Sequence, residues 1–264
     1  MRAAVLRGKC ALITGSTAGL GFAIADRLAA EGCRIVLNGL AAPADDEKAR
    51  TEIARKHGVE VRFHGADLSA PEQITDMMKF ADDTFGGVDI LINNAVVRHF
   101  APAVDFPVER WNEALAVNLS AAFHTIRLAL PGMLQRNWGR IINLASVYSF
   151  VATINRVDYV TTKTAILGLT RAIALETANS NVTCNAIAPG VLPTPAILSR
   201  LERTAAEQGV SKEQATRDYL IDRQPGGKFI PMENVAALVA FLCGPDSQGT
   251  TGAVFPVDGG WTIS

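Results

Sequence analysis

Short apolar runs alternate with longer segments of helical periodicity along the whole chain. The runs lie at residues 10–14, 34–38, 61–65, 89–93, 140–145, 182–188 and 253–257. Most of them are continuously apolar, which is typical of parallel strands that helices cover on both faces. The pattern therefore predicts an α/β fold of the Rossmann type, a doubly wound parallel sheet of about seven strands with right-handed crossovers.

The segments between the runs carry apolar residues at helical spacing. Helices are predicted over 20–31, 45–57, 71–85, 108–135, 158–177 and 233–243. Two further helical patterns, 196–208 and 212–222, lengthen the connection between the sixth and seventh runs. A long insertion at the ligand-binding edge of such a sheet commonly covers the substrate, so we interpret 191–230 as a substrate lid, with an oligomer contact as the alternative. No repeat or linker divides residues 1–264, which we expect to form one domain.

Composition and charge narrow the class of protein. Of the 264 residues, 48% are hydrophobic and 19% are charged, which excludes intrinsic disorder. The 25 basic and 26 acidic residues leave a net charge of -1, so no overall field is available to hold a nucleic acid or an acidic membrane. The four scattered cysteines have neither disulfide nor zinc-ligand spacing, and no apolar run approaches the ~20 residues that span a bilayer. We expect a cytoplasmic protein with no metal site and no membrane or nucleic-acid partner.

A glycine-rich stretch follows the first predicted strand directly. It reads Thr-Gly-Ser-Thr-Ala-Gly-Leu-Gly at 14–21 and leads into a predicted helix. At Gly15, Gly19 and Gly21, a tight turn, close approach to a pyrophosphate and helix packing each exclude a β-carbon. The N-terminus of the helix offers free N–H groups and a positive dipole end to the phosphates. The alternative is a purely structural turn, but strand, loop and helix together predict dinucleotide binding, with Thr17 and Leu20 as further contacts.

The end of the second predicted strand bears on which dinucleotide binds. Asn38 stands there in place of the acidic residue that would grip both ribose hydroxyls of NAD. No Arg or Lys lies there, or beside Gly19, to neutralise the extra phosphate of NADP. Because an uncompensated buried phosphate costs more than one missing hydrogen bond, the sequence favours NAD.

Asp67 and Leu68 follow the third predicted strand. A carboxylate at this place could accept a hydrogen bond from the edge of an adenine. A helix cap is the other interpretation of Asp67, although Ser69 followed by Glu72 fits a capping box better. Both interpretations of Asp67 stay open.

Four polar residues form a candidate catalytic set. Tyr159 and Lys163 are four residues apart on one face of a predicted helix, where the ammonium and a positive nicotinamide would stabilise the phenolate. Ser146, at the carboxyl end of the fifth predicted strand, can offer its hydroxyl to the same substrate oxygen, and Asn118 is a polar residue in an apolar part of the helix predicted over 108–135. By spacing alone, a Tyr-x-x-x-Lys pair is ordinary helix surface, and a lone helical Asn is usually solvated or bonded locally.

Taken in order, these residues resemble a known family. The stretch 14–21, Asn-Asn-Ala at 93–95, Asn118, Ser146 and Tyr-Val-Thr-Thr-Lys at 159–163 are similar to the motifs of the short-chain dehydrogenase/reductases. The resemblance covers the whole chain. It is closer still to the bacterial D-3-hydroxybutyrate dehydrogenases, on stretches such as Asn-Leu-Ser-Ala-Ala-Phe-His at 118–124 and Val-Asp-Gly-Gly-Trp-Thr at 257–262.

The resemblance implies roles for the residues that match. Tyr159 would be the acid/base, Ser146 would polarise the alcohol or carbonyl, and Lys163 would hold the ribose and lower the pKa of the tyrosine. Asn118 would anchor a water that relays protons from Lys163 to solvent. The remaining nucleotide contacts would be Asn94 and Ala95 at the adenine ribose, and Pro189, Gly190 and Thr194 at the nicotinamide. The family commonly forms homotetramers.

Two departures from the family pattern bear on function. Val96 replaces a glycine that lets backbone and cofactor approach closely. In the substrate pocket, where the hydroxybutyrate enzymes have two glutamines, a histidine, a lysine and a tryptophan, this chain has Arg98, Arg200, Tyr148, Arg156 and Val191. The substitutions predict a larger and more cationic pocket, suited to a dicarboxylic hydroxy acid or a sulfonate. Alternatively, the arginines point to solvent or pair with Glu202 and Asp158.

The sequence therefore predicts an NAD-dependent oxidoreductase that interconverts a secondary alcohol and a ketone in a small anionic hydroxy acid. Two alternatives stay open. One is an NADPH-dependent 3-oxoacyl reductase, and the other is a cofactor-binding protein that has lost activity, which Val96 keeps open. His99, beside Arg98, is interpreted as a loop residue and not as a catalyst.

Overall fold

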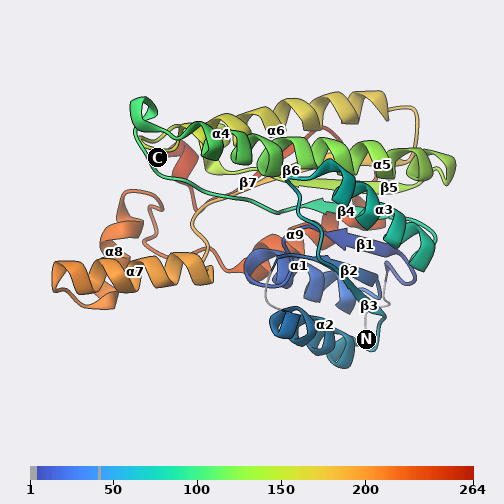
Figure 1. Ribbon diagram of the computed structural model, residues 1–264, viewed down its shortest axis with the longest axis horizontal. Coiled ribbons are helices and arrows are strands. Elements are labelled where there is room, and N and C mark those ends of the chain that lie inside the picture. Colours follow the sequence, from blue (N-terminus) through green and yellow to red (C-terminus); the bar gives the residue numbers. More distant parts are fainter. Residues whose placement is uncertain (1–4, 41–42) are drawn as a thin grey trace.

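A parallel sheet runs through the middle of the molecule in the computed structural model, which describes residues 5–40 and 43–264 (Figure 1). Its strands are β1 (Cys10–Ile13), β2 (Arg34–Asn38), β3 (Val61–His64), β4 (Ile90–Asn93), β5 (Gly139–Leu144), β6 (Val182–Pro189) and β7 (Val254–Val257). They pair in the order β3-β2-β1-β4-β5-β6-β7, and every pair is parallel. The predicted doubly wound, seven-stranded sheet is confirmed.

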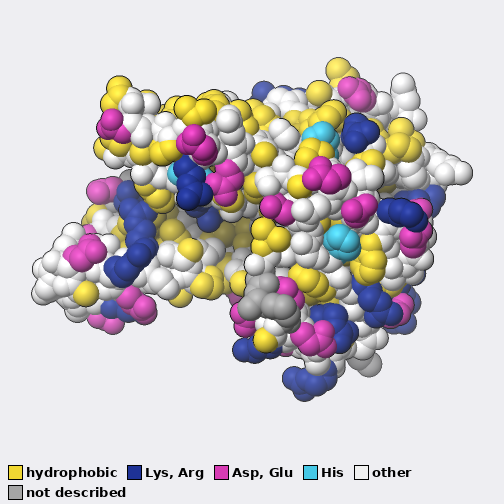
Figure 2. All heavy atoms as spheres, viewed as in Figure 1, with side chains coloured by type: hydrophobic (Ala, Val, Ile, Leu, Met, Phe, Trp, Pro, Cys, Tyr) yellow, Lys and Arg dark blue, Asp and Glu magenta, His cyan; other side chains and the backbone are white. Residues whose placement is uncertain are grey.

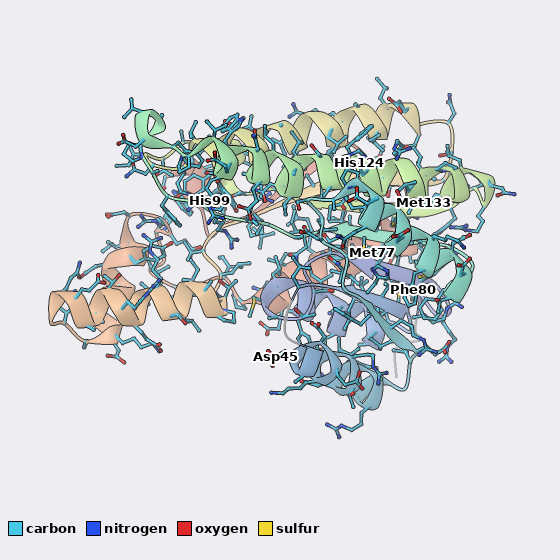
Figure 3. The ribbon with its side chains drawn as sticks, viewed as in Figure 1. Asp45, Met77, Phe80, His99, His124 and Met133 are labelled. Carbon is cyan, nitrogen blue, oxygen red and sulfur yellow. The ribbon has the colours of Figure 1, made fainter. Side chains whose placement is uncertain are left out.

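Helices cover both faces of the sheet. One layer contains α1 (Gly19–Ala30), α2 (Pro43–His57) and α9 (Met232–Cys243), and the other contains α3 (Pro71–Phe85), α5 (Ala121–Gln135) and α6 (Val157–Glu176) (Figure 1). Alternate strand residues feed the two layers: Ile13 packs with α1 and α9, while Leu12 packs with α3 and α5. Met77 and Met133, labelled in Figure 3, are fully buried in the second layer. Burial on both faces explains why the strands are continuously apolar.

The helix predicted over 108–135 is interrupted in the structure, which corrects that expectation. It consists of α4 (Val108–Leu115), a π-helical turn at Ala116–Ser120, and α5. The wider turn accommodates one extra residue, and Asn118 lies buried within it. Its amide bonds both backbone groups of Val97, with Val97 N–H donating to Oδ1 (2.8 Å) and Nδ2 donating to the Val97 carbonyl (3.1 Å). A π turn of this kind is frequent at functional sites.

The capping box expected at Ser69 and Glu72 is absent from the start of α3. The helix begins at Pro71, and its N-cap residue, Ala70, has no side-chain bond to offer. Ser69 is bonded instead to Asp67, whose Oδ1 accepts from both the Ser69 N–H (2.8 Å) and its hydroxyl (2.7 Å). The expectation was wrong because the local Asp67–Ser69 turn competes for the same hydroxyl.

Strand order reverses between β1 and β4, which opens a crevice at their carboxyl ends. The segment α7 (Pro195–Gln208) and α8 (Lys212–Ile221) follows β6 and stands away from the sheet on this side (Figure 1, orange). All four cysteines are free and buried. Among the helices of the described ranges, none is long and apolar enough to cross a membrane.

Candidate active site

A cavity of about 1030 Å³ lies between the carboxyl edge of the sheet and the α7–α8 segment. The glycine loop lines one end, Tyr159 and Lys163 the middle, and α7 and α8 the other end. Figure 2 shows the hollow, with Lys and Arg side chains gathered along the edge of the α7–α8 segment. The volume exceeds that of most small-molecule sites, so a dinucleotide and a small substrate fit together.

The glycine loop has no room for side chains on its protein side. A β-carbon at Gly15, which has φ +60°, would lie 2.9 Å from the Ala95 Cα, and one at Gly21 would lie 2.6 Å from the Asn94 Nδ2. At Gly19, by contrast, the nearest protein atom is 3.8 Å away, so this residue borders the open cavity. Leu20 also lines it. The loop therefore leaves space at Gly19 that could hold a nucleotide pyrophosphate.

Asn94 and Thr14 fasten the loop to the end of β4. The Asn94 Nδ2 donates to the carbonyls of Thr14 (2.9 Å) and Gly15 (2.8 Å). The Thr14 hydroxyl accepts from the N–H groups of Asn94 (2.9 Å) and Ala95 (3.0 Å). This hydrogen-bond network holds the glycine loop and fixes the positions of Asn94 and Ala95, which line the cavity.

Asn38 is buried, and its side chain is fully occupied. Its Oδ1 accepts from the Gly15 N–H (3.3 Å), and its Nδ2 donates to the carbonyls of His64 (3.1 Å) and Ala66 (3.0 Å). The amide thus joins β1, β2 and β3. The cavity wall beside it is formed by Gly39 and Leu40, and a β-carbon at Gly39 would lie 2.8 Å from the Thr17 hydroxyl. These residues bear no charge.

Asp67 and Leu68 lie beside the same end of the cavity. The Asp67 backbone N–H donates to Gln73 Oε1 (2.9 Å), and its Oδ1 holds Ser69. The carboxylate is therefore fixed by the local turn while it borders the cavity. The helix-cap interpretation of Asp67 is wrong, because α3 begins at Pro71 with Ala70 as its N-cap residue and the Asp67 carboxylate bonds to Ser69 instead.

Three of the four candidate catalytic residues, Ser146, Tyr159 and Lys163, line the centre of the cavity. Tyr159 and Lys163 lie on one face of α6 and are 7% and 3% exposed, with the Lys163 Nζ 5.7 Å from the centroid of the Tyr159 ring. The Lys163 Nζ donates to the Leu144 carbonyl (2.5 Å), and the Ser149 hydroxyl donates to the Lys163 carbonyl (2.6 Å). These bonds fix α6 against the end of β5, where Ser146 is located.

The electrostatic environment of Tyr159 favours its ionisation. Burial alone would raise the pKa of the phenol, but Arg98, Lys163, a hydrogen bond with Ser146, and Arg156 together lower it to about 8. Burial also lowers the pKa of Lys163. A tyrosine with this pKa can exchange a proton near neutral pH.

A second, small cavity of about 10 Å³ lies behind the centre. It is bordered by Thr14, Asn93, Asn118 and Lys163. This volume holds one water molecule, and the polar side chains around it supply bonding partners. The π turn therefore places Asn118 beside a water-sized space that reaches Lys163.

Three arginines, Arg98, Arg156 and Arg200, line the cavity beside this centre. Arg156, the N-cap residue of α6, is 9% exposed, and its Cζ lies 4.5 Å from the Tyr159 ring centroid and 4.2 Å from that of Phe100. The Arg98 Cζ lies 5.6 Å from the Tyr159 centroid, and the Arg200 Cζ lies 5.2 Å from that of Phe100.

None of the three arginines has a carboxylate within 4.0 Å in the described part of the chain. Glu202 pairs with Lys212, and Asp158 accepts from the His99 N–H (3.3 Å). The expected alternative partners are therefore occupied elsewhere. The buried Nε of Arg156 has no hydrogen-bond partner among residues 5–40 and 43–264.

Other predicted substrate residues close the pocket. Tyr148 packs edge-on against Tyr159, with centroids 6.1 Å apart. Val191 lies between β6 and α7, at the start of the segment that contains α7 and α8. Its N–H donates to Gln224 Oε1 (2.6 Å), and its carbonyl accepts from the Ile230 N–H (3.0 Å). Pro189 and Gly190 line the cavity just before it, and the Thr194 hydroxyl caps α7 by accepting from the Ile197 N–H (3.4 Å).

Sequence reasoning missed several residues of the cavity wall. Trp261, close to the end of the chain, packs edge-on against Tyr148 with centroids 5.4 Å apart. Phe100, Arg203, Tyr219 and Arg223 also line the cavity. The sequence feature that could have identified Arg203, Tyr219 and Arg223 is the clustering of cationic and aromatic residues in and just after α7 and α8. His99, labelled in Figure 3, lies with its Nε2 3.4 Å from Glu113 of α4.

Comparisons with known proteins identify the family of the chain. The profile of a family described as Enoyl-(Acyl carrier protein) reductase matches residues 15–262. D-beta-hydroxybutyrate dehydrogenases of Cupriavidus necator and Rhizobium meliloti are each 46% identical, over 97% and 96% of this chain and 99% and 98% of their own. The crystal structure of L-sorbose reductase from Gluconobacter frateurii, complexed with NADPH and L-sorbose, is 29% identical, covers 98% of each chain and has a TM-score of 0.94.

The sheet, glycine loop and tyrosine–lysine pair define a Rossmann-type oxidoreductase. The chain belongs to the short-chain dehydrogenase/reductase family and is an NAD(P)-dependent enzyme that acts on CH–OH groups. The resemblance to hydroxybutyrate dehydrogenases is confirmed at the level of sequence similarity.

The Asn38 network generates a prediction about stability. Replacing Asn38 by Ala leaves two buried carbonyls and one N–H group without partners, so we expect the free energy of unfolding to fall by about 2–4 kcal/mol. Urea unfolding followed by circular dichroism measures this loss. Asn179→Ala, at an exposed position, is the control. Equal midpoints for the two variants would contradict the structural role of Asn38.

Proposed function

We propose that the protein interconverts a secondary alcohol and a ketone in a small anionic hydroxy acid, with NAD as its cofactor. One observation carries the proposal. Within the part of the chain that the structure describes, the buried Nε of Arg156 has no hydrogen-bond partner, and the guanidinium lies beside Tyr159 in a cavity that continues to the glycine loop. A substrate anion at Arg156 would compensate the charge and bring an adjacent hydroxyl to the tyrosine.

Proton transfer in this proposal belongs to the chain itself. In oxidation the Tyr159 phenolate accepts the hydroxyl proton of the substrate, and in reduction the phenol returns it to the ketone oxygen. The Ser146 hydroxyl bonds the same oxygen, and Lys163 stabilises the phenolate. Asn118 and the small cavity beside it hold the water that passes the proton from Lys163 toward solvent. The nicotinamide, when bound, supplies or accepts the hydride.

The nucleotide would lie along the cavity from the glycine loop to the end of β6. Its contacts would come from Gly15, Thr17, Gly19, Leu20, Gly21, Asn38, Asp67, Leu68, Asn94, Ala95, Tyr159, Lys163, Pro189, Gly190 and Thr194. The uncharged wall at Gly39 and Leu40 and the nearby Asp67 carboxylate disfavour the extra phosphate of NADP. Val96 borders the cavity, and the bonds of Asn118 to Val97 hold its loop in place.

The substrate would be held by Arg98, Arg156 and Arg200, with Ser146, Tyr148 and Val191 completing its pocket. The segment 191–230 would act as its lid. An oxoacyl substrate without an anion beside these arginines would leave the Arg156 charge uncompensated, which is costly for a buried group. The arginines therefore favour an anionic hydroxy acid over the 3-oxoacyl alternative. Their planar forks suit a second carboxylate or a sulfonate.

We also propose a cytoplasmic homotetramer. Four free, buried thiols suit a reducing compartment. Phe123 and Leu134 of α5 and Leu175 of α6 are exposed apolar side chains on the outer helices, and Figure 2 shows apolar side chains along that edge. Such surfaces commonly pack against other copies.

Replacing Tyr159 by Phe tests the acid/base assignment. We expect kcat to fall by roughly 10²–10⁴-fold, because the proton donor is lost while the ring remains. NADH binding, followed by fluorescence, should be retained. Unchanged turnover with intact NADH binding would contradict the mechanism.

Cofactor preference is measured by comparing kcat/KM for NADH and NADPH with one ketoacid. We expect at least about a tenfold preference for NADH, since the 2′-phosphate of NADPH would face no cation beside Leu40. A preference for NADPH would contradict this assignment and favour the oxoacyl reductase alternative.

Replacing Arg156 by Gln tests the anionic pocket. For a hydroxylated dicarboxylate, we expect KM to rise by roughly 10–100-fold, because charge-assisted hydrogen bonds to the substrate are lost. The wild-type enzyme is assayed in parallel with 3-hydroxybutyrate. A clear wild-type preference for 3-hydroxybutyrate, or an unchanged KM in the variant, would contradict the more cationic pocket.

A further inference from the structure

The backbone around Arg98 is fixed on both sides. On one side, Val97 is bonded twice to the Asn118 amide in the π turn. On the other, the His99 N–H donates to the buried Asp158 carboxylate (3.3 Å), one residue before Tyr159. The backbone of Arg98 is therefore held between the π turn and the start of α6. Its side chain starts from a fixed position near Tyr159.

The Arg98 guanidinium lies as close to the Tyr159 ring as the Lys163 ammonium does. The two distances to the ring centroid are 5.6 Å for the Arg98 Cζ and 5.7 Å for the Lys163 Nζ. The hydrogen bonds of Lys163 include one to the Leu144 carbonyl, whereas none joins Arg98 to a side chain in the described ranges. Two full positive charges therefore approach one phenol from different elements.

The other charged and titratable groups around Tyr159 leave these charges in place. Arg156 adds a third cation, and Tyr148 packs against the ring edge. The carboxylate of Asp158 is bonded to the backbone of the Arg98 loop. The nearby acid of α4, Glu113, is bonded by Arg110 (2.8 Å). No carboxylate among the described residues pairs with Arg98 to cancel its effect on the phenol.

We propose that Arg98 is a positioning residue for proton transfer, which together with Lys163 holds Tyr159 ready to act as the phenolate. This rests on the proposed function only in taking Tyr159 as the acid/base. After burial, which opposes ionisation, Arg98 is the strongest influence on the pKa of Tyr159, ahead of Lys163. Since Arg98 is exposed to solvent, screening limits its effect to about one pH unit.

Ultraviolet titration of tyrosinate in the protein without cofactor or substrate tests the proposal. The chain has three tyrosines, so subtracting the titration of a Tyr159→Phe background isolates Tyr159. We expect Arg98→Gln to raise the midpoint of Tyr159 by about one pH unit, and Arg98→Lys to restore it. In the enzyme, the same variants should move the pH profile of kcat/KM in the same direction.

Arg203→Gln is the matched control. Arg203 of α7 lines the same cavity. Among the described residues, it makes no cation–π contact with Tyr159, so the substitution removes one positive charge from the cavity without removing a contact to the phenol ring. Should Arg98→Gln fail to fold, Arg98→Met, of similar length, carries the same test.

A Tyr159 midpoint that is equal in wild type, Arg98→Gln and Arg98→Met would overturn the proposal, as would an equal shift in Arg203→Gln. Because the titration needs neither cofactor nor substrate, its failure is distinguishable from failure of the proposed function, which the turnover of Tyr159→Phe decides.

Discussion

The site is organised around the buried phenol of Tyr159, which in the proposed mechanism loses and regains a proton. Burial opposes the ionisation of Tyr159, so the site depends on positive charge placed within a few ångströms of its ring. Lys163 approaches along α6, Arg156 from the cap of that helix, and Arg98 from the loop after β4. Three cations, two from α6 and its N-cap and one from the loop after β4, converge on one side chain. The same excess of cations is the basis of the proposed anionic substrate, so in this proposal acid/base chemistry and substrate choice share one electrostatic origin.

The parallel sheet makes this convergence possible. Because all strands run the same way, the ends of β1, β4, β5 and β6 meet at one edge, although they are up to about 180 residues apart in the chain. Polar side chains then fasten the loops to one another: Asn38 joins the glycine loop to β3, and Asn94 joins it to β4. The π turn adds a third fastening through Asn118. Cofactor loop and catalytic centre are thus parts of one hydrogen-bonded edge.

Much of the fold follows from the sequence, because strands buried on both faces and amphipathic helices leave clear patterns. The candidate catalytic set could be proposed from the sequence because its residues match a family motif. The π turn could not, since the apolar spacing of 108–135 continues through it and only the bond from Asn118 to Val97 reveals it. The capping box failed because one hydroxyl had two possible partners. Trp261, Phe100 and Tyr219 escaped notice because their contacts join distant segments, which local patterns do not record.

The central claim is that an anionic substrate places its hydroxyl at Tyr159 by pairing with the arginines beside it. A crystal structure of the enzyme with NADH and a hydroxylated dicarboxylate tests this most directly. The account predicts a substrate carboxylate within hydrogen-bond distance of the Arg156 guanidinium, and the substrate hydroxyl between Tyr159 and Ser146. A bound substrate whose carboxylates face solvent, with the Arg156 guanidinium still unpaired, would contradict it.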